Sequence, residues 1–528
     1  MASDVARNRH AGVLVPLFSL PSSDSWGLGE ILDIPIMGRW LRAAGQGLLQ
    51  ILPINEMAPG QKSPYSAITA MAIDPIFISL RGVEDFLALG GEPALDAAAR
   101  DTLSEVRAGG RVEHDRVRRV KNAALRLAFD RFHRDQVQQQ GPRAAAFRAY
   151  TGRQRWWLDD YAVFRALHAA HDEHPWMTWP DDLKGRRPEA IDRARRELER
   201  EIVFYEYLQW QADMQWRAAR EQAPVSLFGD FPFMVDLDSA DVWANQDLFD
   251  LEASVGVPPD AFSKTGQNWG LPVYRWDVMA GRDDSWLRER ARRSAALYDG
   301  YRIDHLVGFY RTYAIPTSGG KARFRPRDEA AQLVQGERVL GAFQQEGSRI
   351  IAEDLGIVPD FVRASLARLG IPGYKVLRWE RKWHEPEQPF RDPATYPAVS
   401  VAASGTHDTE PLAVWWDTAP AREREQVGEI PMLAAALEHR ELANADFTPA
   451  LRDALLEVLF ASGSDFLILP IQDVFGWRDR INVPATVSDE NWTYRLPWPV
   501  NALENEPQAR ERAARLREWA ERYARLAP

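Results

Sequence analysis

The stretch Tyr298-Asp-Gly-Tyr-Arg-Ile-Asp-His305 decides the fold of this 528-residue chain. Residues 298–303 of this stretch form a short, mainly apolar run that is typical of a buried strand, and the acidic residue Asp304 follows directly. The same arrangement returns at Ser348-Arg-Ile-Ile-Ala-Glu353 and at 398–408, where Ala-Val-Ser-Val-Ala-Ala is followed by Gly405-Thr-His-Asp408. Because parallel strands of a barrel end at one rim, we expect the three carboxylates to point into one cavity.

Eight such apolar runs can be found along the chain. They span residues 12–20, 48–54, 225–235, 298–303, 349–352, 374–379, 398–403 and 465–471. Near-continuous apolar runs are typical of strands that are buried on both faces of a parallel sheet. Helical patterns lie between several of them, such as 33–44 and 361–369. The alternation predicts an α/β fold, a (β/α)₈ TIM barrel.

Two long segments interrupt this alternation within a single catalytic barrel, 1–528. Residues 81–222 are rich in Ala, Arg, Glu and Leu, with helical periodicity over 117–134 and 193–220. They predict a helical subdomain inserted after the second strand. Residues 237–290 read as mixed and loop-like. A loop of this length inside a compact domain is more often functional than idle, so we expect it to lie over the cleft.

Net charge, cysteine content and the N-terminal sequence limit the expected partners and the expected cellular location of the protein. The formal net charge of −11 argues against nucleic acid and against an anionic membrane surface as partners. The chain contains no cysteine, which excludes disulfides, thiolate metal sites and a cysteine nucleophile. The N-terminus is polar, and the run at 12–20 is interrupted by Pro16, which makes it a poor signal peptide and too short to cross a bilayer. A cytoplasmic location is therefore expected.

The chain is unusually rich in tryptophan, with 20 residues. Most are expected to pack in the core and between helices. Four of them stand beside Gly or Asn in segments that read as loops: Trp26, Trp269, Trp477 and Trp492. Flat apolar rings around a cleft suit the C–H faces of sugar rings, so these four are also candidates for sugar contact.

Asp304 is the best candidate for a nucleophile. Arg302 lies two residues before it, so both side chains share one face of a strand. A guanidinium fixed beside a carboxylate stabilises the ionised form, which a nucleophile requires. A purely structural Arg–Asp pair at the end of a strand would give the same pattern.

Glu353 is the candidate for a general acid. It follows Ile-Ile-Ala directly, a position that should bury the stem of its side chain. Burial raises the pKa of a carboxyl group and suits a residue that protonates a leaving oxygen. Its neighbour Asp354 faces the other way on a strand. The alternative is a structural glutamate in the first turn of a helix.

His407 and Asp408 follow a strand and precede a helical pattern at 412–416. They are candidates for gripping adjacent sugar hydroxyls and distorting the ring. A hydrolytic dyad, a metal pair and a helix N-cap remain alternatives. A metal is disfavoured because the chain has no HExxH motif, and the spacing of His168 and His171 on a predicted helix fits a solvated pair or one satisfied by neighbouring groups. Three strand-end carboxylates together suit glycosidic bond chemistry, in which two carboxyl groups flank one C–O bond.

Further motifs make the chain similar to a known family. They are Ser63-Pro-Tyr65-Ser66, Gly229-Asp230-Phe-Pro-Phe, Asp238-Ser-Ala-Asp241-Val-Trp243, Gly256-Val-Pro-Pro-Asp260, Gly266-Gln267-Asn-Trp269-Gly270, Gln472-Asp473 and Asn482-Val-Pro484. From Gly12 to about Trp498 the chain resembles the amylomaltases, or disproportionating enzymes, which are 4-α-glucanotransferases of the α-amylase clan.

The resemblance implies a role for each matching residue. Asp304 would form the covalent glucosyl intermediate, Glu353 would act as acid and then as base, and Asp408 would stabilise the distorted sugar. The donor sugar would be held by Arg302, His305 and His407. The glucan groove would be lined by Tyr65, Gln267, Trp269 and Asn482.

The chain departs from the family pattern at several positions. These are Leu271, Thr409, Glu410, Ala485, Thr493 and Tyr494. All are expected in rim or acceptor-side loops. They therefore bear on chain-length preference and transfer efficiency more than on the type of reaction.

The sequence therefore predicts a 4-α-glucanotransferase that moves α-1,4-glucan segments between maltooligosaccharides by double displacement with retention. Neither an organic cofactor nor a catalytic metal is needed for this chemistry. A retaining α-glucan hydrolase of the same clan is the first alternative, and a non-catalytic glucan-binding protein is the second. The three carboxylates weigh against the binding protein.

Overall fold

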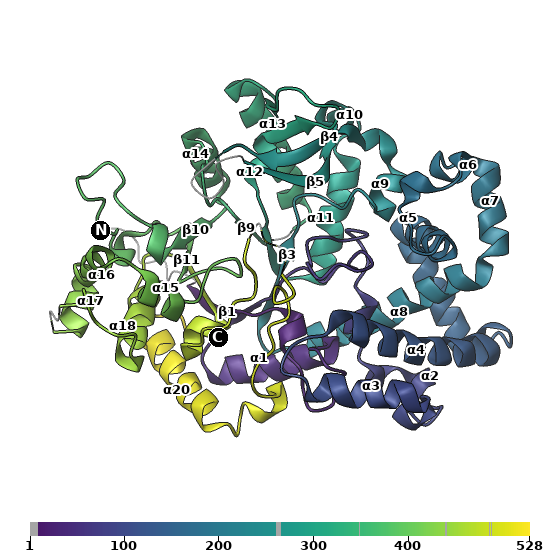
Figure 1. The fold of residues 1–528 in the computed structure, drawn as a ribbon, viewed down its shortest axis with the longest axis horizontal. Coiled ribbons are helices and arrows are strands. Elements are labelled where there is room, and N and C mark those ends of the chain that lie inside the picture. Colours follow the sequence, from purple (N-terminus) through teal and green to yellow (C-terminus); the bar gives the residue numbers. More distant parts are fainter. Residues whose placement is uncertain are drawn as a thin grey trace.

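A closed barrel of eight parallel strands forms the centre of the computed structural model (Figure 1). The strands follow the order β1-β12-β11-β10-β9-β6-β3-β2 around the barrel. They are β1 (His10–Leu14), β2 (Leu48–Gln50), β3 (Ser226–Phe231), β6 (Gly300–Ile303), β9 (Arg349–Ala352), β10 (Gly373–Val376), β11 (Ser400–Ala403) and β12 (Phe466–Pro470). Each of the eight predicted apolar runs contains or overlaps one of them, so the TIM barrel is confirmed.

The structure describes residues 9–259, 266–347, 349–438, 441–484, 486 and 488–527. Three residues named above, Asp260, Ser348 and Ala485, lie outside the described residues.

Several strands are shorter than the apolar runs that predict them. The run at 12–20 continues beyond β1 into a 3₁₀ turn at Leu17–Ser19, and the run at 374–379 ends in one at Leu377–Trp379. The apolar residues Leu17, Phe18 and Leu377 of these turns are buried in the core, which explains why the apolar runs extend beyond the strands. The strands themselves pack tightly, since a Cβ atom on Gly300 would lie 2.6 Å from the ring of Phe228 on the neighbouring strand.

Between β2 and β3 the chain forms a group of helices, which lie on the right of Figure 1. They are α2 (Glu84–Leu87), α3 (Ala97–Ala108), α4 (His114–Phe132), α5 (Pro142–Ala170), α6 (Asp181–Lys184), α7 (Pro188–Glu197) and α8 (Glu199–Gln222). The helix expected over 193–220 is interrupted at Leu198, which has φ −110° and ψ 18° and separates α7 from α8. We refer to residues 81–222 as the helical insertion.

The described parts of the segment 237–290, which are 237–259 and 266–290, form regular elements where the sequence predicts a loop. It contains α9 (Ala240–Ala244), β4 (Phe249–Val257), β5 (Gln267–Tyr274), α10 (Trp276–Gly281) and the start of α11 (Ser285–Leu297). The strands belong to a second sheet with the order β5-β4-β7-β8, where β7 is Thr312–Pro316 and β8 is Arg323–Arg325. β4 follows an alternating apolar pattern, Phe-Asp-Leu-Glu-Ala-Ser-Val-Gly-Val, which was the available signal for a strand with two unlike faces.

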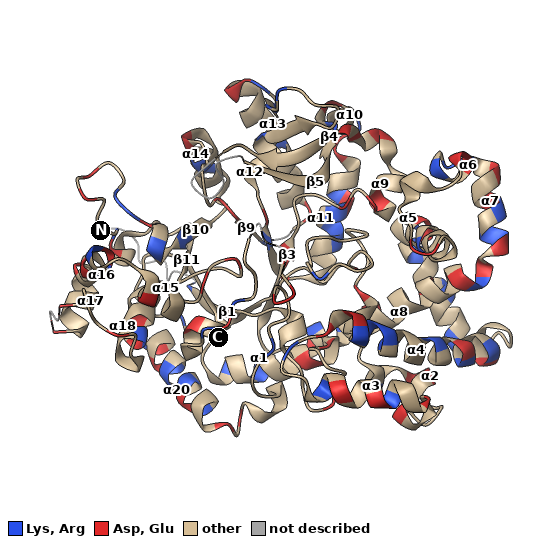
Figure 2. Ribbon diagram, in the orientation of Figure 1, with Lys and Arg blue, Asp and Glu red and all other residues tan. Residues whose placement is uncertain are grey.

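The remaining helices surround the barrel. They are α1 (Ile34–Ala43), α12 (Val307–Tyr310), α13 (Glu329–Gln345), α14 (Asp360–Leu369), α15 (Leu412–Thr418), α16 (Ala421–Gly428), α17 (Pro431–Ala436), α18 (Pro449–Phe460), α19 (Ile471–Phe475) and α20 (Pro507–Arg522). Acidic and basic residues alternate along the outer helices (Figure 2). No helix in the described part of the chain is long and apolar enough to cross a membrane.

Candidate active site

Asp304 and Glu353 stand at the same level on neighbouring strands. Ile303 is the last residue of β6 and pairs with Ala352, the last residue of β9, so the two acids are the next residues of each strand. The ladder continues through both positions, because Asp304 N donates to Phe231 O (3.0 Å) and Glu353 N donates to Ile303 O (3.0 Å). The register of two parallel strands therefore places both carboxylates at the C-terminal mouth of the barrel.

Arg302 lies beneath Asp304 and joins it to a second aspartate. Its Nη2 binds Asp304 Oδ1 at 2.8 Å, and its Nη1 binds both carboxylate oxygens of Asp230 at 2.9 and 2.8 Å. Asp230 comes from β3, where it pairs in register with Arg302, and it also accepts a hydrogen bond from the hydroxyl of Tyr65 (2.8 Å). Sequence reasoning assigned no role to Asp230. Because Arg302 is almost fully buried, we interpret it as a support of Asp304.

Glu353 has the properties of a carboxylic acid that keeps its proton near neutral pH. Burial raises the pKa of Glu353 to about 7; Arg302 opposes this shift, while the nearby Asp304 carboxylate adds to it. The backbone N–H of His305 donates to Glu353 Oε2 at 2.9 Å. His305 therefore contacts the acid through its backbone, while its ring packs edge-on against Trp269 with the ring centroids 4.8 Å apart.

Asp408 and His407 are neighbours on the turn after β11, and their side chains contact each other. The His407 Nε2 and Asp408 Oδ2 atoms are 3.3 Å apart, and Asn482 Nδ2 donates to Asp408 Oδ1 at 2.6 Å. Burial would raise the pKa of Asp408, but His407 and Asn482 hold it below its usual value. Burial alone would lower the pKa of His407, yet the Asp408 carboxylate raises it. The arrangement keeps Asp408 ionised.

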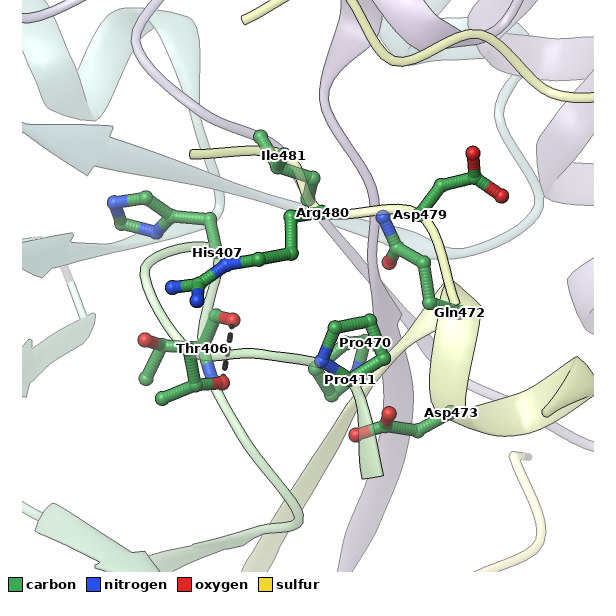
Figure 3. Close-up of a pocket in the computed structure, with 10 residues that line it drawn as sticks. Thr406, His407, Pro411, Pro470, Gln472, Asp473, Asp479, Arg480 and Ile481 are labelled. Carbon is green, nitrogen blue, oxygen red and sulfur yellow. Dashed lines mark hydrogen bonds between the residues drawn. The ribbon is translucent and has the colours of Figure 1, made fainter. Parts of the chain in front are cut away.

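Hydrogen bonds from Arg480 and Thr409 stabilise the turn that carries His407 and Asp408. In Figure 3 the guanidinium of Arg480 lies beside the Thr406-His407 turn, and its Nη2 donates to Asp408 O at 2.9 Å. The hydroxyl of Thr409 accepts from Thr406 N (2.9 Å) and donates to Thr406 O (3.0 Å). Sequence reasoning expects Thr409 in a rim loop, but it is buried and braces the turn.

Other departures from the family pattern also lie in the scaffold. Glu410 pairs with Arg378 at 2.7 Å. Thr493 and Tyr494 are buried, and Leu271 is a partly buried residue of β5. Thr493 and Tyr494 are thus less accessible than expected, while the place of partly exposed Glu410 in a rim loop stays a prediction.

A cavity of about 440 Å³ lies above these groups. Seven of the ten predicted site residues line it: Tyr65, Gln267, Trp269, Asp304, His407, Asp408 and Asn482. Arg302, Glu353 and His305 contact each other or these lining residues, so all ten are brought together. The cavity is also lined by Asn268, Pro484 and Trp492. Among the described residues, no cluster of His, Asp and Glu side chains is arranged to hold a metal ion.

Trp269 reaches the cavity from the second sheet. It lies on β5, whereas sequence reasoning expects it in a loop. Its Nε1 donates to Gln267 Oε1 at 3.1 Å, which ties the two predicted groove residues together. Gly266 (φ 74°) and Gly270 (φ 71°) flank this segment in the left-handed conformation that glycine adopts freely.

Known proteins share the sequence pattern and the fold of this chain. A family model described as 4-alpha-glucanotransferase matches residues 15–501. The 4-alpha-glucanotransferase of Thermus thermophilus is 34% identical over 538 residues, covering 98% of this chain and 99% of that protein. That of Chlamydia pneumoniae is 32% identical over 500 residues, covering 92% and 91%. The solved structure of the amylomaltase from Streptococcus agalactiae in complex with acarbose matches with a TM-score of 0.80 at 26% identity, covering 98% of this chain and 99% of that chain. The chain belongs to the 4-α-glucanotransferase family.

Proposed function

We propose that this protein is a 4-α-glucanotransferase that moves α-1,4-glucan segments between maltooligosaccharides by retaining double displacement. The observation that carries the proposal is the register of β6 and β9, which sets Asp304 and Glu353 side by side at the barrel mouth. Retaining enzymes need two neighbouring carboxyl groups with different tasks, one ionised and one protonated. Burial of Glu353 favours its protonated form, while Arg302 binds Asp304 and holds it in place as the nucleophile.

The first step forms an enzyme-bound glucosyl ester. A carboxylate oxygen of Asp304 attacks C1 of the donor sugar while the bond from C1 to the glycosidic oxygen breaks. The proton of Glu353 passes to that oxygen, and the leaving glucan departs with a free 4-hydroxyl. Asp408, kept ionised by His407 and Asn482, binds hydroxyls of the distorted sugar beside the reaction centre.

The second step releases the bound segment to a new glucan. The Glu353 carboxylate removes the proton from the 4-hydroxyl of the acceptor, whose oxygen attacks C1 as Asp304 leaves. Two inversions at C1 restore the starting α configuration. Maltooligosaccharides and longer α-1,4-glucans are the proposed donors and acceptors, and a cytoplasmic location is also proposed.

Incubation with maltotriose tests this function. A ladder of longer glucans, resolved by chain length, is expected for transfer. Products that are all shorter than maltotriose would favour the hydrolase, and unchanged maltotriose would favour a binding protein.

The pH profile should report the ionisation of Glu353. Only the protonated form of Glu353 can donate to the leaving oxygen. Because the pKa of Glu353 is raised to about 7, activity should persist up to about pH 7 and decline at higher pH. We expect kcat/KM for maltotriose to fall by about tenfold per pH unit on the alkaline side. An α-glucosyl fluoride donor needs no proton and should lack this decline. A maltotriose profile that stays level to pH 9 would contradict the role of Glu353.

Trp269→Ala should impair transfer more than hydrolysis. The ring lines the cavity and packs against His305, where it can stack on the acceptor sugar and keep water from the ester. We expect transfer to fall by about tenfold, with free glucose rising relative to long products and Tm close to wild type. Trp156→Ala, which removes an exposed tryptophan of α5, is the matched control. Equal loss of both activities together with a sharp loss of Tm would make Trp269 a packing residue.

A further inference from the structure

Trp492 is held in a strained conformation at the wall of the cavity. Its φ of 64° lies in the left-handed region, which bulky residues seldom adopt. Its ring centroid lies 5.8 Å from that of Tyr65 and 5.9 Å from that of His407. Strained residues persist only where the surroundings hold them, and they cluster at functional sites. The contacts that hold Trp492 therefore identify the residues that position its ring.

Both backbone polar groups of Trp492 are fixed. Its N–H donates to Ile481 O at 2.7 Å, next to Asn482, which binds Asp408. Its carbonyl oxygen accepts from His114 Nε2 at 2.9 Å. A carbonyl can only accept, so Nε2 carries the hydrogen of this buried imidazole. Burial lowers the pKa of His114, in keeping with a neutral ring.

His114 belongs to the helical insertion, at the first residue of α4. Further bonds join the same two parts of the chain. Val112 N donates to Thr493 O at 2.9 Å. The guanidinium of Arg495 donates to the carbonyls of Val106 (3.0 Å), Arg107 (2.9 Å) and Gly109 (2.7 Å). Residues 106–114, from the end of α3 to the start of α4, thus hold residues 492–495, of which Trp492 lines the cavity.

We propose that His114 is a positioning residue of the glucan cleft: it holds the backbone of Trp492 in the left-handed conformation so that the Trp492 ring faces the bound sugar beside Tyr65 and His407. The inference rests on the proposed function and extends it, because it makes the helical insertion part of the substrate site. His114 itself touches no sugar and acts through Trp492.

A double-mutant cycle tests this link. His114→Phe keeps the size and the aromatic edge contact with Phe18 but removes the donor. We expect it to raise KM for maltotriose by about fivefold, the fold-change that corresponds to one lost hydrogen bond, with kcat near wild type. His114→Gln, whose amide nitrogen can occupy the place of Nε2 and donate to the Trp492 carbonyl, should keep the wild-type KM. In the Trp492→Ala background, His114→Phe should leave KM unchanged while still lowering Tm.

The control variant separates positioning from folding. Tyr150→Phe removes another buried bond from a side chain of the insertion to a backbone carbonyl, Tyr150 Oη to Gln209 O at 3.1 Å. It should lower Tm without changing KM. If His114→Phe is insoluble, His114→Asn, whose amide is too short to reach the carbonyl, takes its place in the cycle.

Two results would overturn the inference. One is a wild-type KM for the His114 variant; the other is an equal rise of KM in the wild-type and Trp492→Ala backgrounds. A wild-type protein that leaves maltotriose unchanged would instead refute the proposed function. In that case the affinity of the His114 and Trp492 variants for maltoheptaose would replace KM as the measured quantity. A failure of the positioning role can then be told apart from a failure of the proposed function.

Discussion

Asp304→Asn is expected to lower maltotriose turnover by about 10⁴-fold or more, the scale of loss when a covalent nucleophile is removed. An amide cannot form the glucosyl ester, so neither transfer nor hydrolysis can proceed. The fold should survive, because Arg302 keeps both bonds to Asp230 when it loses its partner Asp304. Binding of maltoheptaose, measured by calorimetry, should therefore remain within a few-fold of wild type.

Asp299→Asn is the matched control for this variant. Asp299 precedes β6 directly, as Asp304 follows it, so the two aspartates flank opposite ends of one strand. Its carboxylate accepts from Leu227 N at 2.8 Å and pairs with Arg220 at 2.6 Å, which is a structural role. We expect a lower Tm with kcat retained. Near-normal turnover by Asp304→Asn, or an equal loss in both variants, would remove Asp304 from the role of nucleophile.

The barrel and its two central acids could be predicted because their signal is local. A short apolar run that ends at an acid specifies both a buried strand and a side chain at its mouth. Asp230 does not follow this rule, because it lies inside β3, one residue before the end of the strand. Its run continues to Val235, because Phe233, Met234 and Val235 are buried beyond the strand. The acid therefore stood inside an apolar run, and the end of the strand was hidden.

Other parts of the site could not be read from sequence because they depend on distant contacts. The bond between His114 and Trp492 joins residues 378 positions apart, and no local pattern marks either partner for the other. The sequence predicts a loop where the second sheet delivers Trp269 and Gln267, because Gly and Pro residues follow the alternating pattern of β4. Thr409 is expected in a rim loop, since it follows the His407-Asp408 string and departs from the family pattern. Its hydroxyl is used inside the turn, which only the folded geometry reveals.

Glu353→Gln should lower maltotriose turnover by about 10²–10⁴-fold, because no proton can reach the leaving oxygen and no base can activate the acceptor. The two tasks can be separated with α-maltosyl fluoride, whose fluoride departs without a proton. The first step should then run once, and the variant should accumulate a maltosyl ester on Asp304. This adduct is detectable as an added maltosyl mass on the protein.

Azide distinguishes the second task, since this anion attacks C1 without losing a proton. With α-maltosyl fluoride as donor, azide should restore turnover of Glu353→Gln and yield the α-configured maltosyl azide, the outcome of two inversions.

Asp354→Asn is the matched control: it changes the adjacent carboxyl, which accepts from Tyr374 N at 2.8 Å, and should affect Tm more than rate. A β-configured azide would indicate a single displacement and contradict the ester on Asp304. Near-normal maltotriose turnover by Glu353→Gln would instead show that another group supplies the proton, and the raised pKa of Glu353 would then reflect only its burial beside Asp304.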